Sequence, residues 1–369
     1  MARDIDEWFL CGIQQVAEGT YNPRCLKRYY FTDEVVDQLH LSDRIFQHIL
    51  MQQLKPTFKH VMNKNCYHLN GPTGVKYATQ RIKHVLQGVN PRYIIRADIK
   101  SFYASIPHFK LIKDIKKHYN DPKVIAMLEN IITNPIDTPR GMKNPSMGIA
   151  LRGPLSQFFS ALYLKPLDDA FDRTNITYLR FQDDILILCK TKRQLARARR
   201  RMMDVLHERH LSLSRKKTRI GSIDRGFHFL GVQYSPTQPV DNQSTSVNDV
   251  ALTPSSHVHD LDTWGGRTVI EHQNRGFCMV PHSRTLRKAR EQVKSMVTTG
   301  VSLRRIRNYL HRFVQWLQKT STEWSYQTLL HDFVRTCKIS AAAGIAADLF
   351  RRATSSDAVL FQGLSCILA

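Results

Sequence analysis

Hydrophobic and polar residues follow two different periods along the chain, and the changes of period mark the predicted elements. The first ninety residues are predicted to be mostly helical, because apolar residues within 35–39 and 43–54 recur at helical spacing without strand alternation. Residues 92–97 read RYIIRA, a short run rich in β-branched residues that predicts a strand ending at Asp98. Pro107 is predicted to open a further, basic helix.

A second group of elements is predicted after a Pro/Gly/Asn-rich loop at 135–148. Apolar residues at helical spacing predict one buried helix over 155–171, with a bend at Pro166. Residues 177–189 (TYLRFQDDILILC) contain two short apolar runs on either side of Gln-Asp-Asp, which is typical of a tight hairpin with acids at its tip. Residues 192–210 predict a helix with an arginine-rich outer face.

The last part of the chain changes character again. Residues 227–234 predict a strand, and the following segment, 236–282, is rich in Ser, Thr, Asn, Asp and Pro. So long a weakly patterned segment within a compact protein predicts an inserted loop. From residue 283 onward, apolar residues at helical spacing predict helices whose arginines lie on a separate face.

The charge of the chain narrows the partners. Lys and Arg number 54 against 31 for Asp and Glu, giving a formal charge of +23 and a pI near 9.9, which favours a polyanionic partner such as nucleic acid. No apolar run approaches the roughly 20 residues of a spanning helix, and the acid-rich residues 1–19 do not resemble a signal peptide. Seven scattered cysteines without a CxxC pair argue against a disulfide framework or zinc ribbon. We therefore expect a cytoplasmic protein that does not bind membranes.

Carboxylates stand at the ends of two predicted strands, at Asp98 and at Asp183-Asp184. Carboxylates held close together repel one another unless a cation lies between them. Two divalent ions roughly 3.5–4 Å apart would neutralise them, and such a pair promotes in-line displacement at phosphorus. For any single Asp-Asp pair the alternative is a solvated turn or helix surface, which is the expectation for Asp168-Asp169.

Five short motifs occur in a fixed order: DIKSFYASI at 98–106, RGPLSQFFSALYLKPLD at 152–168, FQDD at 181–184, LSRKKT at 213–218 and FLG at 229–231. Their order and spacing resemble the palm of reverse transcriptases, particularly the bacterial group that includes group II intron, retron, diversity-generating and phage-defence enzymes. The resemblance implies an α+β right-hand polymerase. Its expected domains are fingers at 1–90 with part of 110–150, a palm at 91–235, the polar insertion at 236–282, and a helical thumb and C-terminal region at 283–369.

The same resemblance implies a catalytic site. Two Mg²⁺ ions, or Mn²⁺, would be held by Asp98, Asp183 and Asp184 with the backbone carbonyl of Ile99, and Lys217 would protonate the departing pyrophosphate. Tyr103 would be the aromatic steric gate that favours dNTPs over ribonucleotides.

Further nucleotide contacts are expected around this site. Ser156 and Gln157 are implied by the second motif, whereas Lys76 and Arg81 are candidates for triphosphate contacts that no motif fixes. The expected contacts with nucleic-acid strands come from the basic helix faces and the FLG motif: Arg197, Arg200, Arg201, Phe229, Gly231, Arg304, Arg305 and Arg307.

The sequence departs from the family pattern at two places close to the expected nucleotide. The hairpin motif has Phe181 for the usual tyrosine and Gln182 for a small residue, and Arg152 stands where a glutamine is common. Arg152 and Gln182 are therefore expected to contact the nucleotide and to alter template use.

The expected function is RNA-directed DNA synthesis. Its expected partners are dNTPs, an RNA template or non-coding RNA, a DNA product or primer, and a second copy or second reverse transcriptase subunit. No RNase H or endonuclease motif is found, which favours by analogy a specialised enzyme of anti-phage defence. Two alternatives stay open: DNA synthesis without a nucleic-acid template, or a catalytically silent nucleic-acid-binding scaffold.

Overall fold

The computed structural model describes residues 5–31, 35–151, 153–237 and 276–320. Its centre is a four-stranded sheet of order β6-β7-β3-β8, in which every neighbouring pair is antiparallel. Its strands are β3 (Tyr93–Asp98), β6 (Thr177–Phe181), β7 (Asp184–Cys189) and β8 (Arg219–Ser222). The predicted strand at 92–97 and the predicted hairpin at 177–189 are thus its three longest strands. The mixed α+β class expected from the sequence is confirmed.

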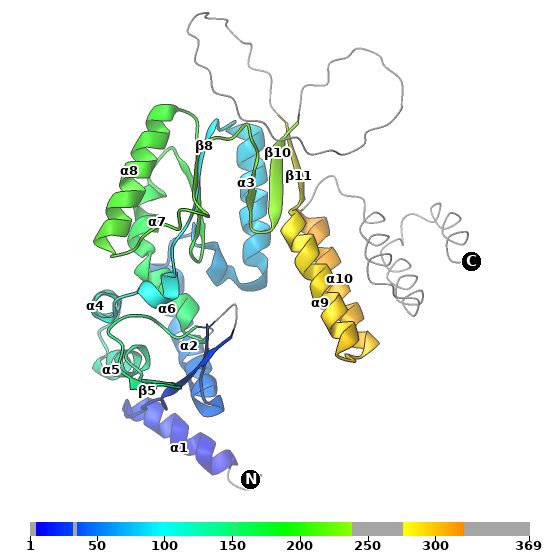
Figure 1. Cartoon of the computed structure of the whole chain (residues 1–369). Coiled ribbons are helices and arrows are strands. Elements are labelled where there is room, and N and C mark those ends of the chain that lie inside the picture. Colours follow the sequence, from blue (N-terminus) through cyan, green and yellow to red (C-terminus); the bar gives the residue numbers. More distant parts are fainter. Residues whose placement is uncertain (1–4, 32–34, 152, 238–275, 321–369) are drawn as a thin grey trace, which may run out of the picture.

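The two faces of this sheet are buried against different layers, since successive side chains of a strand point to opposite faces. Ile95, Ala97, Ile185 and Ile187 belong to a core shared with the helices on one face. Those helices are α6 (Ser156–Tyr163), α7 (Lys165–Asp172) and α8 (Lys192–Glu208). Figure 1 shows α8 on one side of the sheet and α3 (Gly74–Gly88) on the other.

The opposite face packs against α3 and a small second sheet of order β11-β10-β9. Leu186 and Leu188 share this second core with Ile82 of α3 and Phe229. The small sheet consists of β9 (Phe227–Phe229), β10 (Val232–Pro236) and β11 (Phe277–Pro281). The single strand predicted for 227–234 is therefore wrong, because its residues form a two-strand hairpin. The polar insertion predicted for 236–282 also ends too late, since β11 pairs with β10 over five residues.

The predicted bend at Pro166 is a complete break between α6 and α7. Leu164 ends one helix and precedes the next, and Pro166 lies in the first turn of α7. Proline is tolerated there because the first helical N–H groups have no partner within the helix.

The N-terminal part is less helical than predicted. Residues 35–39, expected to be helical, include β2 (Val35–Gln38), which pairs with β1 (Leu26–Tyr30) in a second four-stranded sheet, β2-β1-β4-β5. A short apolar run cannot by its period be assigned to helix or strand, and here Asp37 is held by an ion pair of 2.6 Å to Arg28 on the neighbouring strand. The other elements of this part are α1 (Ile5–Glu18), α2 (Leu41–Val61), the 3-10 helix η1 (Tyr67–Thr73), the 3-10 helix η2 (Phe102–Ser105), α4 (His108–His118), α5 (Pro122–Ile132), β4 (Ile136–Thr138) and β5 (Gly141–Lys143).

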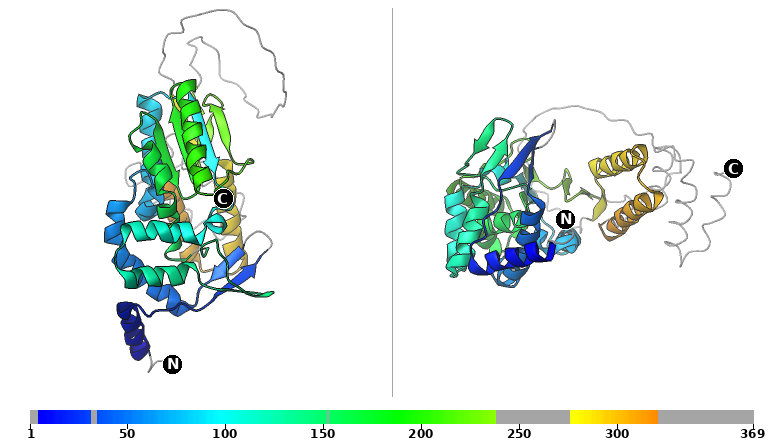
Figure 2. Two further views of the ribbon diagram at one scale, coloured as in Figure 1. Left: turned by 90° about the vertical axis from the view of Figure 1, so that its left-hand side faces the viewer. Right: turned by 90° about the horizontal axis from the view of Figure 1, so that it is seen from below.

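Two helices, α9 (Ser283–Thr298) and α10 (Leu303–Thr320), follow the small sheet. They lie side by side in Figure 1 and Figure 2 and share a core of their own that includes Val293, Ile306 and Leu310. The helices predicted from residue 283 are thus confirmed as far as Thr320. Among the described helices, none combines the length and apolar character needed to cross a bilayer.

Candidate active site

The three acids of the sequence motifs meet at one end of the central sheet. Asp98 and Asp184 are directly opposite each other in the register of β3 and β7. Asp183 lies in the tight turn between β6 and β7, and its carbonyl accepts a hydrogen bond of 3.3 Å from the Ile99 amide. The predicted grouping of Asp98, Asp183 and Asp184, with Ile99 beside them, is present in the fold.

These carboxylates lie in surroundings that resist their charge. Burial and the neighbouring charge of Asp183 raise the pKa of Asp184 to about 6, although Arg96 opposes the rise. Burial, and then the charge of Asp98, also raise the pKa of Asp183. Burial and mutual repulsion therefore both disfavour the ionised forms of Asp183 and Asp184 in the protein alone.

Lys217 is the cation in direct contact with this group. Its ammonium nitrogen lies 3.0 Å from an Asp98 carboxylate oxygen, and this hydrogen bond is the main cause of its raised pKa. The turn that carries Lys217 is joined to β3, because the Ser214 amide donates to the Asp98 carbonyl at 2.8 Å. Sequence reasoning placed Lys217 at the acids, and the structure does the same.

The acids as they stand do not form a closed set of metal ligands. Within the described ranges, no group of three or more His, Cys, Asp and Glu side chains has the arrangement needed to hold an ion. The donor set nevertheless suits a hard divalent cation. Such an ion is bound by carboxylate oxygens, and its charge would favour the ionised forms of Asp183 and Asp184, which burial disfavours.

The tip of the β6–β7 hairpin is held from behind by two buried side chains that sequence reasoning missed. Gln182 has φ +56, a left-handed conformation that non-glycine residues rarely adopt. Its amide donates to Nδ1 of His68 at 3.1 Å, and its carbonyl accepts from Arg180 at 3.2 Å. Both backbone polar groups of the strained residue are thus satisfied, which fixes where Asp183 points.

His68 also connects the tip to the helix expected beside the nucleotide. Its Nδ1 accepts from Gln182, so Nε2 carries the hydrogen and donates to the Gln157 carbonyl at 3.1 Å. Burial, with the nearby charge of Arg180, lowers the pKa of His68 to about 3. The imidazole is therefore neutral and acts as a fixed bridge between η1, the hairpin and α6.

Arg180 is fully buried and paired with Asp168, which corrects the expectation that Asp168 lies on a helix surface. Two guanidinium nitrogens contact the two Asp168 oxygens at 2.7 and 2.5 Å, and the Tyr178 hydroxyl donates to Asp168 at 2.7 Å. The partner residue Asp169 is exposed and pairs with Lys165, as a surface acid would. The position of Arg180 within an apolar strand could have indicated this pair, because a buried arginine requires an acidic partner.

Tyr103 lies between the acids and α6. Burial raises the pKa of its hydroxyl, which makes a side-chain hydrogen bond with Ser160 and lies near enough to Asp183 to feel its charge. Of the residues expected near the nucleotide, Gln157 is exposed, whereas Ser156 is buried and bonds the Ala150 carbonyl. Ser156 is thus a support of the helix start in this structure.

The remaining expected contacts are less closely associated with the acids. Arg81 lines a pocket with Lys190 and Gln194 at the far end of the β6–β7 hairpin. Lys76 is half-buried in the first turn of α3, and it is not among the cations that act on the pKa of Asp183 or Asp184 in the described ranges. Arg152 lies outside the described residues.

The arginines of α8 lie across the central sheet from the acid side chains. α8 covers the face that contains Ile95 and Ile187, whereas Asp98 and Asp184 share the register of the opposite face. The three expected contacts, Arg197, Arg200 and Arg201, are exposed, and Arg201 donates to the Ala170 carbonyl at 3.0 Å. The structure does not bring them to the site.

The FLG motif forms the turn of the β9–β10 hairpin. Phe229 is 1% exposed and packs in the core, so its ring supports the turn from within. Leu230 and Gly231 both have positive φ, +50 and +83, as the two central residues of a type I′ turn do. A Cβ at Gly231 would lie 3.1 Å from the Thr285 hydroxyl oxygen, so glycine permits the approach of α9.

A cluster of cations beside the acids was not foreseen. Arg96 of β3 lies on the same face of the sheet as Asp98. The positive charges of Arg284 and Arg219 repel that of Arg96. Next to them the rings of His228 and His282 lie 4.3 Å apart, and burial together with these arginines lowers the pKa of His228 to about 4. The basic cluster, Arg96, Arg219, His228, His282 and Arg284, draws on β3, β8, β9 and the start of α9, which is why no linear motif revealed it.

Comparison with known proteins identifies the family. A family model described as reverse transcriptase (RNA-dependent DNA polymerase) matches residues 35–234, more than half of the chain. The chain belongs to the reverse transcriptase family. All three acids, Tyr103, Lys217 and the β9–β10 turn lie within the matched range.

Among curated proteins, the chain is 23% identical over 230 residues to Protein YkfC of Escherichia coli (strain K12). The match covers 52% of this reverse transcriptase family member and 60% of YkfC. Among solved structures, it is similar to telomerase from Candida albicans in complex with a fragment of telomeric RNA, with a TM-score of 0.48, 11% identity, and 98% and 67% of the two chains covered. Apo telomerase from Candida tropicalis gives a TM-score of 0.43 at 13% identity, covering 62% and 51% of the chains.

Proposed function

We propose that this protein is an RNA-directed DNA polymerase that adds deoxynucleotides at the acid end of the central sheet. The observation that carries the proposal is the gathering of Asp98, Asp183 and Asp184 within a matched reverse transcriptase domain, where burial and mutual repulsion raise the pKa values of Asp183 and Asp184. A catalytically silent scaffold has no use for such repulsion. The scaffold alternative is therefore the weaker one.

Asp98, Asp183 and Asp184, with the Ile99 carbonyl, would hold two Mg²⁺ ions, or Mn²⁺. When bound, such ions stabilise negative charge at phosphorus and on the attacking and leaving oxygens. Lys217 would give a proton to the departing pyrophosphate; in support, its ammonium group contacts Asp98 and its side chain is 62% exposed. A raised pKa keeps that proton on Lys217 until the leaving oxygen develops charge.

Tyr103 is proposed to select the sugar. Its hydroxyl is tied to Ser160 and its ring packs beside Phe102, with centroids 5.6 Å apart, so the ring has a defined position near Asp183. A ring held there would meet a ribose 2′-hydroxyl. The exposed Gln157 and the half-buried Gln182 would contact the base or template nearby, and Arg152 is proposed to contact it too.

The basic cluster is proposed to hold the backbone of the strand that ends at the acids. Arg96, Arg219 and Arg284 repel one another in the free protein, and phosphates would relieve this repulsion. Arg304, Arg305 and Arg307 of α10 are proposed to contact nucleic acid farther along. We further propose that the protein acts in the cytoplasm, in anti-phage defence, with a dedicated RNA or a second subunit. This part of the proposal rests on the likeness of the motifs to those of bacterial defence enzymes. DNA synthesis without a template is the second candidate, since Gln182 departs from the family pattern.

The test is dNTP incorporation by purified protein carrying Asp183→Asn together with Asp184→Asn. We expect incorporation to fall by at least a thousandfold while the circular dichroism spectrum stays that of the unaltered protein. Asp169→Asn is the matched control, because Asp169 belongs to the other Asp-Asp pair and is exposed. Undiminished incorporation by the double variant would refute the proposed active site.

Sugar selection is tested with Tyr103→Ala in single-nucleotide extension with dATP against ATP. Removing the ring should raise use of ATP relative to dATP by at least tenfold, and Tyr103→Phe should keep the original preference. An unchanged preference in the alanine variant would assign Tyr103 to the core alone.

A further inference from the structure

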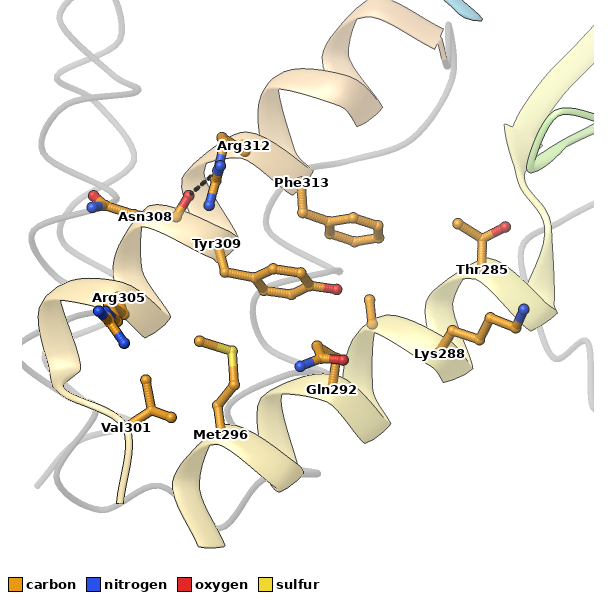
Figure 3. Close-up of a pocket in the computed structure, with 11 residues that line it drawn as sticks. Thr285, Lys288, Gln292, Met296, Val301, Arg305, Asn308, Tyr309, Arg312 and Phe313 are labelled. Atoms are coloured by element: carbon orange, nitrogen blue, oxygen red, sulfur yellow. Dashed lines mark hydrogen bonds between the residues drawn. The ribbon is translucent and has the colours of Figure 1, made fainter. Parts of the chain in front are cut away.

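The helices α9 and α10 form a groove outside the proposed active site, and Arg305 is the one residue of its lining assigned to nucleic acid above. They pack through buried residues such as Val293 and Ile306, and beside this contact they leave a cavity of about 770 Å³. Figure 3 shows side chains from both helices extending into it. The groove therefore has two walls of regular structure.

The inner surface of the groove is aromatic. Tyr309 and Phe313, one helical turn apart on α10, have rings inclined by only 3° with centroids 6.5 Å apart. Met296 of α9 extends toward them in Figure 3. These side chains are half-buried and line the cavity, and Phe313 also stacks on Trp316 with ring centroids 5.8 Å apart. They offer flat apolar surfaces of the kind on which nucleobases stack.

The rim of the groove is positively charged. Lys288 of α9 and Arg305 and Arg312 of α10 line it, and all three are exposed. No aspartate or glutamate is among the residues that line the cavity in the described part of the chain. A peptide or lipid ligand would need acidic groups at this spacing, whereas a nucleic-acid strand has a phosphate beside every base.

One end of the groove adjoins the active site. Thr285, in the first turn of α9, lines the cavity and donates to the Gly231 carbonyl at 3.1 Å, at the turn of the β9–β10 hairpin. The preceding residue, Arg284, belongs to the basic cluster beside the acids. A strand that reaches the acids would thus find the mouth of the groove next to it.

We infer that this groove binds an unpaired segment of nucleic acid, with a base on Tyr309 and phosphates on Lys288, Arg305 and Arg312. Stacking requires an open base face, which a duplex conceals along its length and a single strand presents at every nucleotide. The inference rests on the proposed function only in that a nucleic acid reaches the site. It adds a second contact with nucleic acid, which prefers a single strand to a duplex.

The experiment measures binding of a labelled mixed-sequence single strand, and of a duplex of the same length, by fluorescence anisotropy. It uses the full chain without dNTPs or divalent ions, so the result does not depend on polymerisation. Tyr309→Leu keeps apolar volume and removes the ring, Tyr309→Phe restores the ring, and Tyr77→Leu alters an exposed tyrosine on α3 as the matched control.

Tyr309→Leu should weaken binding of the single strand by about tenfold to a hundredfold and leave duplex binding within about twofold. Tyr309→Phe and Tyr77→Leu should bind both as the unaltered protein does. Lys288→Gln with Arg312→Gln should lower the salt slope for the single strand by about 0.7 for each phosphate that the protein no longer neutralises. An unchanged single-strand affinity in Tyr309→Leu, or an equal loss for duplex, overturns the inference. Loss of incorporation in the Asp183/Asp184 variant has no bearing on this outcome.

Discussion

Two Asp-Asp pairs lie within 16 residues of each other, and the structure uses them in opposite ways. Asp168 is buried, and its charge is matched by Arg180 and by the hydroxyl of Tyr178. Asp184 is half-buried, and burial together with the charges of Asp183 and Asp98 raises its pKa although Arg96 and Lys217 oppose the rise. A buried acid that is neutralised by its own chain supports the fold, whereas one that is not is available to a ligand.

The two sites are also joined mechanically. Arg180 binds Asp168 with one part of its guanidinium group and the carbonyl of Gln182 with another. The matched pair thus holds the hairpin tip on which the unmatched acids lie. Removing the Arg180–Asp168 pair should therefore disturb the acids at the hairpin tip, whereas substituting those acids should leave the Arg180–Asp168 pair intact.

The largest effect is expected from Arg180→Met, which leaves the buried Asp168 without its cationic partner. Such a change typically costs about 3–5 kcal/mol of unfolding free energy, and it also frees the Gln182 carbonyl. Chemical denaturation would measure the loss, and incorporation should fall with it. Arg180→Met combined with Asp168→Leu should recover a large part of the stability, because no buried charge then remains. Arg200→Met, on the exposed face of α8, should be neutral. A stable, active Arg180→Met protein would break the comparison.

The next effect concerns the unmatched acid and pH. The pKa of Asp184 is about 6 in the folded protein against 3.8 ordinarily, so the folded state holds its proton more tightly than the unfolded state. Without metal, its contribution to stability is present below about pH 4 and is lost as pH rises through 6. The difference of about two units corresponds to about 3 kcal/mol at most.

Thermal unfolding in EDTA at pH 5 and 7.5 measures this effect. Asp184→Asn should have the higher Tm at pH 7.5 and a smaller change between the two pH values. Mg²⁺ should raise the Tm of the unaltered protein at pH 7.5 and have little effect on the variant. A lower Tm for Asp184→Asn at pH 7.5 in EDTA would contradict the view that its charge is unmatched.

The smallest effect should come from Gln182→Gly at the junction of the two sites. Glycine adopts φ +56 without strain but also gains freedom in the unfolded chain, so the unfolding free energy should rise by at most about 1 kcal/mol. His210→Gly, at φ +57, is the matched substitution away from the acids. Urea denaturation of both variants measures the change. Destabilisation at position 182 alone would show that the Gln182 side chain, and not only its backbone, holds the tip.

Elements were predicted correctly from the sequence where a hydrophobic pattern extended over many residues or where the functional residues were neighbours in the chain. The strand ending at Asp98, the hairpin around Asp183 and the helix α8 were predicted. The position of Lys217 beside the acids was also predicted, because proteins that share the order of these motifs share their arrangement in space. What the sequence could not give were pairings between distant residues. Asp168 with Arg180, His68 with Gln182, and the basic cluster depend on contacts across 12 to more than 100 positions. The strand β2 was missed because its four residues satisfy either period.

The order of strands in the central sheet separates the site into parts with different resistance to opening. Asp98 ends β3 and Asp184 begins β7, the two inner strands, each of which has a neighbouring strand on both sides. Lys217 belongs to the turn that leads into β8, an edge strand with four residues. Local opening should begin at such an edge, so hydrogen exchange should be slow at the amides of β3 and β7 and faster at β8. If Lys217 is the proton donor that we propose, it is carried by the part of the site that opens first, while the acids lie on the part that opens last.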